Sequence, residues 1–137
     1  MRLGLMACLA LALAGCASMA AAEPQGDWRL AEIDGAPVIA SSHPSLHLDG
    51  ARASGSGGCN GFGADVARVS DQLVFTHVIT TMMACASTDG GDLMAQEHAY
   101  LGALQTPLRM AIPDDDVLIL SAADGRTLQF TRVAQTN

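Results

Sequence analysis

The sequence predicts an α+β fold in which an antiparallel sheet curls around a single helix. Many short segments alternate apolar and polar residues between turn signals, whereas only one segment, near residue 100, has helical periodicity. Strands that follow one another with one helical interruption favour an antiparallel sheet over a parallel α/β arrangement. A chain of 137 residues fits one domain.

Each predicted strand is a short run of alternating residues that ends at a turn. We expect strands at residues 28–33, 36–38, 45–48, 51–56, 62–69, 73–79, 108–112, 117–121 and 127–133. Asp-Gly pairs at 34–35, 49–50 and 124–125 favour tight turns between neighbouring strands. Hairpins are therefore expected along most of the chain.

The helix is expected over residues 92–105. Its apolar residues recur at intervals of three and four, and they are Leu93, Met94, Tyr100, Leu101 and Leu104. Gly90 and Gly91 precede this segment, Pro107 follows it, and Asp92 is a suitable N-cap.

The start of the chain is typical of a bacterial lipoprotein signal peptide, which we assign to residues 1–15. Arg2 supplies a positive charge, and Leu3–Leu13 form an apolar run too short to span a bilayer about 30 Å thick. The following residues, Leu13-Ala14-Gly15-Cys16, look like a lipobox. The expected lipidation site is therefore Cys16.

Lipidation would attach the protein permanently to a membrane, because several acyl chains bury methylenes at about 0.8 kcal/mol each. Residues 16–26 would be a flexible tether after Cys16, and residues 27–134 the folded domain. Ala17 follows the lipidated cysteine, which favours the periplasmic face of the outer membrane. The alternative is cleavage after Ala20-Ala21-Ala22, which would release a soluble periplasmic protein.

The charge composition disfavours nucleic acid as a partner. The chain carries a formal charge of -7, with fourteen carboxylates and seven arginines but no lysine. Binding to phosphates depends largely on basic side chains that displace counterions. An envelope protein or a small apolar molecule is the better candidate.

The stretch GSGGCNGFG, residues 55–63, has five glycines but fits neither common phosphate-binding motif. A P-loop needs a lysine, and a dinucleotide fingerprint needs a following helix where this sequence predicts a strand. Glycine also allows positive φ and close approach of another strand, and Asn60 tolerates the same backbone conformation. A structural bend is the interpretation that fits these residues.

Two cysteines remain once Cys8 is assigned to the signal peptide and Cys16 to the lipid. In an oxidising compartment, Cys59 and Cys85 are most simply a disulfide, which would stabilise the domain by roughly 3.5 kcal/mol. The alternative is a pair of free or reactive thiols, as in a thiol-dependent redox enzyme. No C-x-x-C motif supports that alternative.

Glu97 lies four residues from both Leu93 and Leu101, on the apolar face of the predicted helix. An unpaired buried carboxylate would be costly, so we expect Glu97 to accept hydrogen bonds from backbone amides near Cys59 or Cys85. General acid or base chemistry is the alternative role.

Other residues have simpler interpretations than metal binding. The histidines do not have the spacing of a metal signature; they are His43, His47, His77 and His98. Methionines can bind copper, but they more often fill gaps in a core, which is what we expect of Met82, Met83, Met94 and Met110. The run Asp114–Asp116 lacks the remaining ligands of a calcium loop and is expected to be a turn. We expect no metal or cofactor.

Several motifs occur in an order that resembles the META domain family, typified by the HslJ-type heat-shock lipoproteins. The motifs are Trp28-x-Leu30, Gly58-Cys59-Asn60 with Phe62, Thr81-Met82-Met83-Ala84-Cys85, Met94-x-x-Glu97-x-x-Tyr100-Leu101-x-x-Leu104, Asp116-x-Leu118-x-Leu120 and Leu128-x-Phe130. The resemblance covers about residues 28–132 and marks Gly58, Asn60, Phe62, Thr81, Met83 and Glu97 as family positions. Met82 is a departure, because many relatives carry a basic residue there.

The resemblance implies a partly open antiparallel β-barrel packed on one helix, without enzymatic activity. It also implies a binding or stress-protective role in the cell envelope, connected with tolerance of heat and antibiotics. Two alternatives are an inhibitor of a lytic enzyme and a pilotin-like escort of an outer-membrane protein, the latter by analogy of fold alone.

Overall fold

The computed structural model describes residues 23–135 and contains nine strands and one helix. The strands are β1 (Gly26–Ile33), β2 (Ala36–Pro37), β3 (Ser45–Asp49), β4 (Arg52–Ser56), β5 (Gly61–Val69), β6 (Gln72–Thr80), β7 (Leu108–Asp114), β8 (Val117–Ala122) and β9 (Thr127–Arg132). The helix α1 spans Leu93–Leu104 and connects β6 to β7. The predicted signal peptide, residues 1–15, and the predicted lipidation site Cys16 lie outside the described residues.

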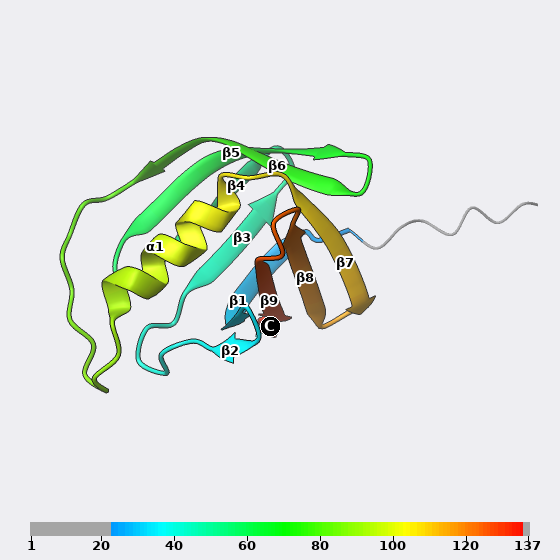
Figure 1. The fold of residues 1–137 in the computed structure, drawn as a ribbon. Coiled ribbons are helices and arrows are strands. Elements are labelled where there is room, and N and C mark those ends of the chain that lie inside the picture. The colour runs from blue at the N-terminus through cyan, green and yellow to red at the C-terminus, as the bar shows by residue number, and fades with distance from the viewer. Residues whose placement is uncertain (1–22, 136–137) are drawn as a thin grey trace, which may run out of the picture.

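The strands form one antiparallel sheet that closes into a barrel (Figure 1). Eight strands follow the order β1-β3-β4-β5-β6-β7-β8-β9, and the pairing of β9 with β1 closes the ring. The short strand β2 pairs with the end of β1. The joint between β6 and β7 is short, since only Gln72↔Arg109 and Leu73↔Leu108 pair there. The predicted fold class is confirmed, and the partial opening of the barrel lies between β6 and β7.

The predicted hairpins are confirmed with small shifts at their ends. The turns at Asp34-Gly35, Asp49-Gly50 and Asp124-Gly125 connect the strands that the sequence predicts. One difference is in β7, which continues to Asp114 through a register shift after Ala111, so the turn before β8 is shorter than predicted.

The barrel interior and the inner face of α1 form one apolar core. Tyr100 of α1 is fully buried, with Phe62 and Phe130 edge-on at centroid distances of 5.9 and 6.0 Å. Its hydroxyl donates to the Ser45 carbonyl at 3.0 Å, and burial raises the pKa of this hydroxyl. The helix is thus attached to β3 as well as packed on the core.

The helix begins where the sequence predicts. The Asp92 side chain accepts a hydrogen bond from the Ala95 amide at 2.9 Å, which caps the first turn. The inner face carries Leu93, Glu97, Tyr100, Leu101, Ala103 and Leu104. Met94 was expected on this face but is exposed.

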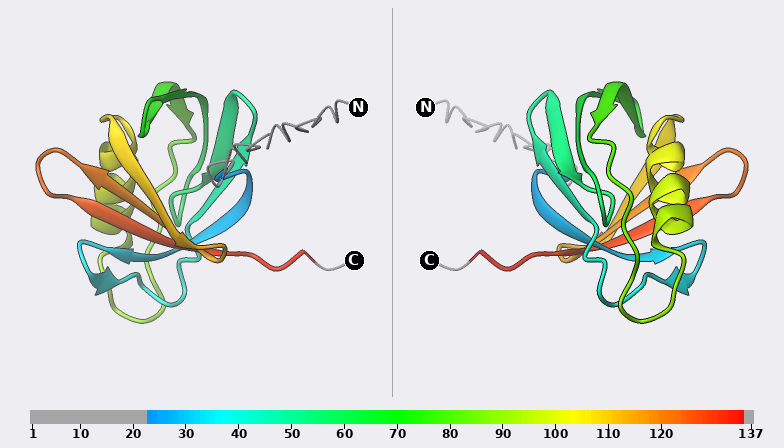
Figure 2. Two further views of the ribbon diagram at one scale, coloured as in Figure 1. Left: turned by 90° about the vertical axis from the view of Figure 1, so that its right-hand side faces the viewer. Right: turned by 90° about the vertical axis from the view of Figure 1, so that its left-hand side faces the viewer.

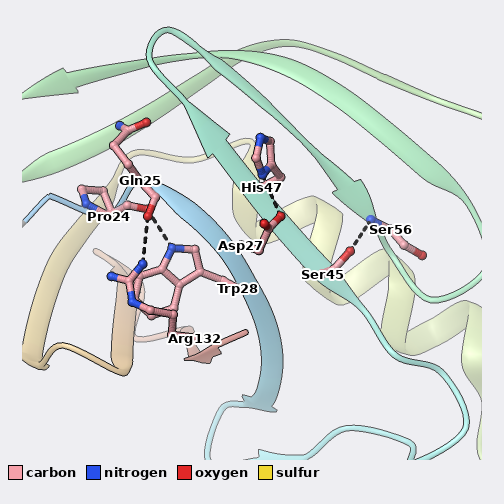
Figure 3. Close-up of polar contacts among 8 residues, drawn as sticks. All are labelled: Pro24, Gln25, Asp27, Trp28, Ser45, His47, Ser56 and Arg132. Carbon is pink, nitrogen blue, oxygen red and sulfur yellow. Dashed lines mark hydrogen bonds and ion pairs between the residues drawn. The ribbon is translucent and has the colours of Figure 1, made fainter. Parts of the chain in front are cut away.

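The residues just before β1 lie against the barrel (Figure 3). The Trp28 indole donates to the Pro24 carbonyl at 2.7 Å, and the Arg132 guanidinium stacks 4.1 Å above the Trp28 ring. Arg132 also donates to the Gln25 carbonyl at 2.9 Å. The last residues of the predicted tether, from Pro24 to Gly26, are therefore part of the folded unit.

The two ends of the described chain leave the same side of the barrel, while α1 lies on the other side (Figure 2). The Val133 amide donates to the Asp27 carbonyl at 2.9 Å, which brings the two ends together. None of the helices within residues 23–135 has the length and apolarity needed to cross a membrane.

Candidate functional site

A buried carboxylate holds the glycine-rich bend of residues 55–63 against α1. Glu97 is 4% exposed, and its Oε2 accepts hydrogen bonds from the backbone amides of Cys59 at 2.9 Å and Asn60 at 2.6 Å. Its Oε1 accepts a third bond from the Asn60 side chain at 2.6 Å. The structure thus places Glu97 against the Cys59 loop, one of the two loops the sequence suggested.

These hydrogen bonds keep Glu97 ionised. Burial raises the pKa of the carboxyl, but the bonds from the Asn60 side chain and from the Asn60 and Cys59 amides together lower it below its ordinary value. A general acid at neutral pH would need the opposite shift. The geometry therefore assigns Glu97 a structural role.

Asn60 links the glycine bend to the segment after β6. Its Nδ2 donates to Glu97 and, at 3.1 Å, to the Met83 carbonyl. Its Oδ1 accepts from the Thr81 hydroxyl at 2.9 Å and from the Met83 amide at 2.7 Å. All four hydrogen-bonding positions of this amide are used, which fixes its orientation.

The disulfide joins the same two segments. Cys59 and Cys85 are bonded, with their Cα atoms 5.8 Å apart, and both residues are half-buried. Residues 81–85 have no regular secondary structure, yet the Asn60 hydrogen bonds and the disulfide both hold them. This segment therefore has a defined position without belonging to the sheet.

Two glycines allow the bend to come so close to Glu97. A Cβ atom at Gly57 would lie 2.6 Å from Cγ and 2.7 Å from Oε2 of Glu97. Gly58 has φ of 120°, a backbone conformation that other residues rarely adopt. The glycine content of the motif thus serves close packing and a bend.

A hollow of about 570 Å³ lies between the Thr80–Ala84 segment and α1. On the helix side it is lined by Met94, His98, Leu101 and Gln105, and it also reaches Asn60 and Glu97. We call it the methionine hollow, because Met82 and Met83 line it together with Met94. Met82 is 96% exposed and Met83 56% exposed.

The prediction that these methionines fill the core is wrong for Met82, Met83 and Met94. The hydrogen bonds of Asn60 to Thr81 and Met83 hold residues 81–83 at the surface, so the Met82 and Met83 side chains face solvent. Met94 is exposed on α1. Met110 is half-buried and packs against the core, as expected.

The edge of β6 beside this hollow is unpaired over most of its length. Beyond Leu73, the described residues pair β6 with β5 but not with β7. Ile79, near the end of this edge, is 71% exposed. A second hollow of about 530 Å³, lined by Ile79, Phe62 and three glycines of the bend among others, lies next to it.

The predicted site residues fall into three places. Gly58, Cys59, Asn60, Thr81, Met83, Cys85 and Glu97 surround the Glu97 hydrogen bonds. Phe62 is instead a core residue, packed on Tyr100, and Cys16 lies outside the described residues.

The remaining polar residues are dispersed. His47 contacts Asp27 at 2.7 Å and His77 contacts Asp65 at 2.9 Å, both at the surface. The Asp116 amide donates to Asp114 at 2.9 Å in the expected turn. Within residues 23–135, histidine, cysteine and acidic side chains form no group of three or more that could hold a metal ion.

The sequence analysis did not predict that His98 lines the methionine hollow or that β6 has an unpaired edge beside it. His98 follows Met94 by four residues and therefore shares its side of the helix, which was a readable signal. The unpaired edge was not readable, because it depends on where β7 pairs.

Comparisons with known proteins agree with the motif analysis. A family model described as the META domain matches residues 20–135. A search of curated proteins finds no match. A structure described as "NMR structure of the protein from Burkholderia xenovorans" is 26% identical, with TM-score 0.64, and the match covers 81% of this chain and 83% of that one. Another NMR structure, 21% identical over 78% of this chain and 88% of its own, has TM-score 0.63 and shows the fold alone.

Replacing Glu97 by Gln is expected to lower the unfolding free energy by about 2–3 kcal/mol at pH 7, because charged hydrogen bonds are lost. If the Gln oxygen accepts from the Cys59 and Asn60 amides, its NH₂ group must face the Asn60 NH₂ group. The folded-state pKa of Glu97 is lowered, so its stabilisation is present above the unfolded value, near 4.5, and is lost as pH falls through the folded value.

Urea unfolding of both proteins from pH 7 to pH 3 measures this effect. The difference in unfolding free energy between wild type and Glu97→Gln should shrink below about pH 4.5. Glu32→Gln is the matched control, because Glu32 makes no hydrogen bond or ion pair to a side chain within the described residues. A difference that stays constant with pH would contradict the assigned role of Glu97.

Replacing both cysteines, as Cys59→Ala with Cys85→Ala, is expected to lower the unfolding free energy by roughly 3.5 kcal/mol. The bonded residues are 26 positions apart, and a loop of this length gives that value in the chain-entropy relation. The barrel should nevertheless remain folded, because Asn60 and Glu97 hold the same segments. Circular dichroism and urea unfolding test both statements, and an unchanged midpoint would refute the first.

Proposed function

The chain belongs to the META domain family, and we propose that it is a non-catalytic binding module of the cell envelope. In this proposal the methionine hollow and the free edge of β6 receive an extended segment of a partner protein. We place this role in tolerance of heat and antibiotic stress, as the family resemblance implies.

The unpaired edge of β6 carries this proposal. Within residues 74–80 of β6, Val74 to Thr76, Ile79 and Thr80 pair with β5, and none of these residues pairs with a described strand on the other side. An exposed strand edge offers backbone donors and acceptors that another extended chain can pair with. An incoming segment would continue the sheet where the barrel opens.

The exposed apolar residues beside the edge support the same role. Ile79, Met82 and Met83 all lie at the end of β6 or just after it, and each is more than half exposed. Large apolar side chains gathered at the surface are typical of interaction sites, and methionine adapts to partners of different shape.

Hydrogen bonds and the disulfide hold the backbone beneath this surface. Asn60 holds the backbone of Met83 through both its amide and its carbonyl, and the disulfide fixes Cys85 two residues later. A preorganised surface loses little conformational entropy when a partner binds. The exposed methionines are thus presented on a fixed backbone.

A small apolar ligand fits these observations less well. The volume of the hollow, about 570 Å³, lies in the range of small-molecule sites. However, Met82 on its wall is almost fully exposed, so a small ligand would remain in contact with water. A protein segment would cover Met82 and Ile79 together.

We further propose that the protein is attached to the membrane through Cys16. The lipobox sequence Leu13-Ala14-Gly15-Cys16 supports this attachment, and the chain order places the anchor before the first residue of the barrel. Both described ends leave the barrel on the side away from α1 (Figure 2), which would leave the methionine hollow facing the periplasm.

Intact-mass spectrometry of the protein purified from its native membrane is expected to show a chain that starts at Cys16 and carries acyl groups. A Cys16→Ser variant should lack the acyl mass and leave the membrane fraction. A mature chain that starts at Glu23 would contradict the anchor but not the binding role.

Partner binding is tested by placing a photo-crosslinking residue at position 82 of the full chain in living cells. We expect a discrete adduct from position 82 and none from position 69, since Val69 is an exposed apolar residue at the far end of the same hairpin. Introducing Ile79→Glu should abolish the adduct, whereas Val69→Glu should not.

Hydrogen exchange on the purified complex adds an independent readout, because strand addition should protect those amides of residues 74–80 that are not bonded to β5. Equal adducts at positions 82 and 69, or a complex without this protection, would refute the proposal. The identity of the partner then distinguishes a lytic enzyme from an outer-membrane protein that the module escorts.

A further inference from the structure

We propose that the methionine hollow also contains a binding site for one soft monovalent cation, Cu(I). The donors are the thioethers of Met82, Met83 and Met94 and the imidazole of His98. This inference concerns the donor atoms of the hollow and does not depend on a partner protein.

The fold brings these four side chains to one hollow from two elements. Met94 and His98 are four residues apart in α1, so they lie one turn apart on the same side of the helix. Met82 and Met83 come from the segment that lines the facing wall. The Met94 sulfur accepts a hydrogen bond from the Cys85 amide at 3.5 Å, which places it next to that segment.

The donor side chains are exposed to solvent and make few hydrogen bonds within the described residues. All four side chains are exposed, so a cation would reach them without opening the core. The His98 side chain takes part in no hydrogen bond or ion pair within residues 23–135. The Met94 sulfur has one weak hydrogen bond, which a metal could replace.

Three thioethers and one imidazole favour a soft metal ion over a hard one. Thioether sulfur favours Cu(I), and imidazole also suits copper, whereas Mg²⁺ and Ca²⁺ require several oxygen ligands. The one carboxylate at the hollow, Glu97, is already occupied by three hydrogen bonds. The nearby cysteines are joined in a disulfide and provide no thiolate for Zn²⁺.

The segment that carries two of the donors is preorganised. Asn60 fixes the backbone of Met83, and the disulfide fixes Cys85, so binding need not order the chain. The methionine side chains remain flexible enough to adjust their sulfur positions. Binding of Cu(I) in this way involves no change in oxidation state.

The test uses the mature protein purified in detergent, after free thiols have been blocked with N-ethylmaleimide. Ag(I), a redox-inert probe of Cu(I) sites, is titrated while the methionine methyl signals are followed by NMR. We expect one equivalent to shift the signals of Met82, Met83 and Met94, and Zn²⁺ to leave them unchanged. Competition with bicinchoninate under ascorbate then gives the affinity for Cu(I).

The double variant Met83→Leu with Met94→Leu should weaken metal binding by at least about 10- to 100-fold, the loss that removal of a supporting group alone typically causes. Met110→Leu is the matched control, because Met110 is half-buried against the core and does not line the hollow. His98→Asn should also weaken binding.

The two proposals fail in distinguishable ways. Ile79→Glu should abolish the adduct from position 82 while leaving Ag(I) binding intact, because Ile79 does not line the methionine hollow. Absence of Ag(I) binding, or binding that the double variant and Met110→Leu alter equally, would overturn the metal site. Either result would leave the test of partner binding unaffected.

Discussion

The hydrogen bonding of one buried carboxylate is the constraint on which the rest of the site depends. Glu97 is on the inner face of α1 and needs donors, because an unpaired buried charge would be strongly destabilising. The donors come from the glycine bend, which must therefore press its backbone onto the helix. Asn60 passes this constraint on to the Met83 backbone, and so to a segment that the sheet does not hold.

The exposed methionines follow from that arrangement. Only two residues of β6, Gln72 and Leu73, pair with β7. The segment after β6 is held instead by Asn60 and by the disulfide, which lead it toward α1. This path keeps residues 81–85 at the surface. The disulfide and the hydrogen bonds of Asn60 thus keep these apolar side chains exposed, although the hydrophobic effect would favour their burial.

The strands, the turns and the helix with its Asp92 cap could be predicted because each rests on local alternation, Asp-Gly pairs or helical spacing. The position of Glu97 among apolar neighbours also predicted that it needs backbone donors. The pairing of β1 with β9 was out of reach, because it joins residues about a hundred positions apart. The exposure of Met82 was not predictable either, because methionine is equally common in protein cores. Its position at the surface depends on the contacts of Asn60 with the neighbouring Met83.

The contact between the two ends of the described chain has a topological consequence. Since β9 pairs with β1 and the Val133 amide donates to the Asp27 carbonyl, the ring of strands closes where the two described ends lie side by side. A short linker could join these ends, and the chain could be reopened at an exposed turn such as Asp124-Gly125. The fold is therefore suited to circular permutation, in which the same ring of strands is encoded from a different starting residue.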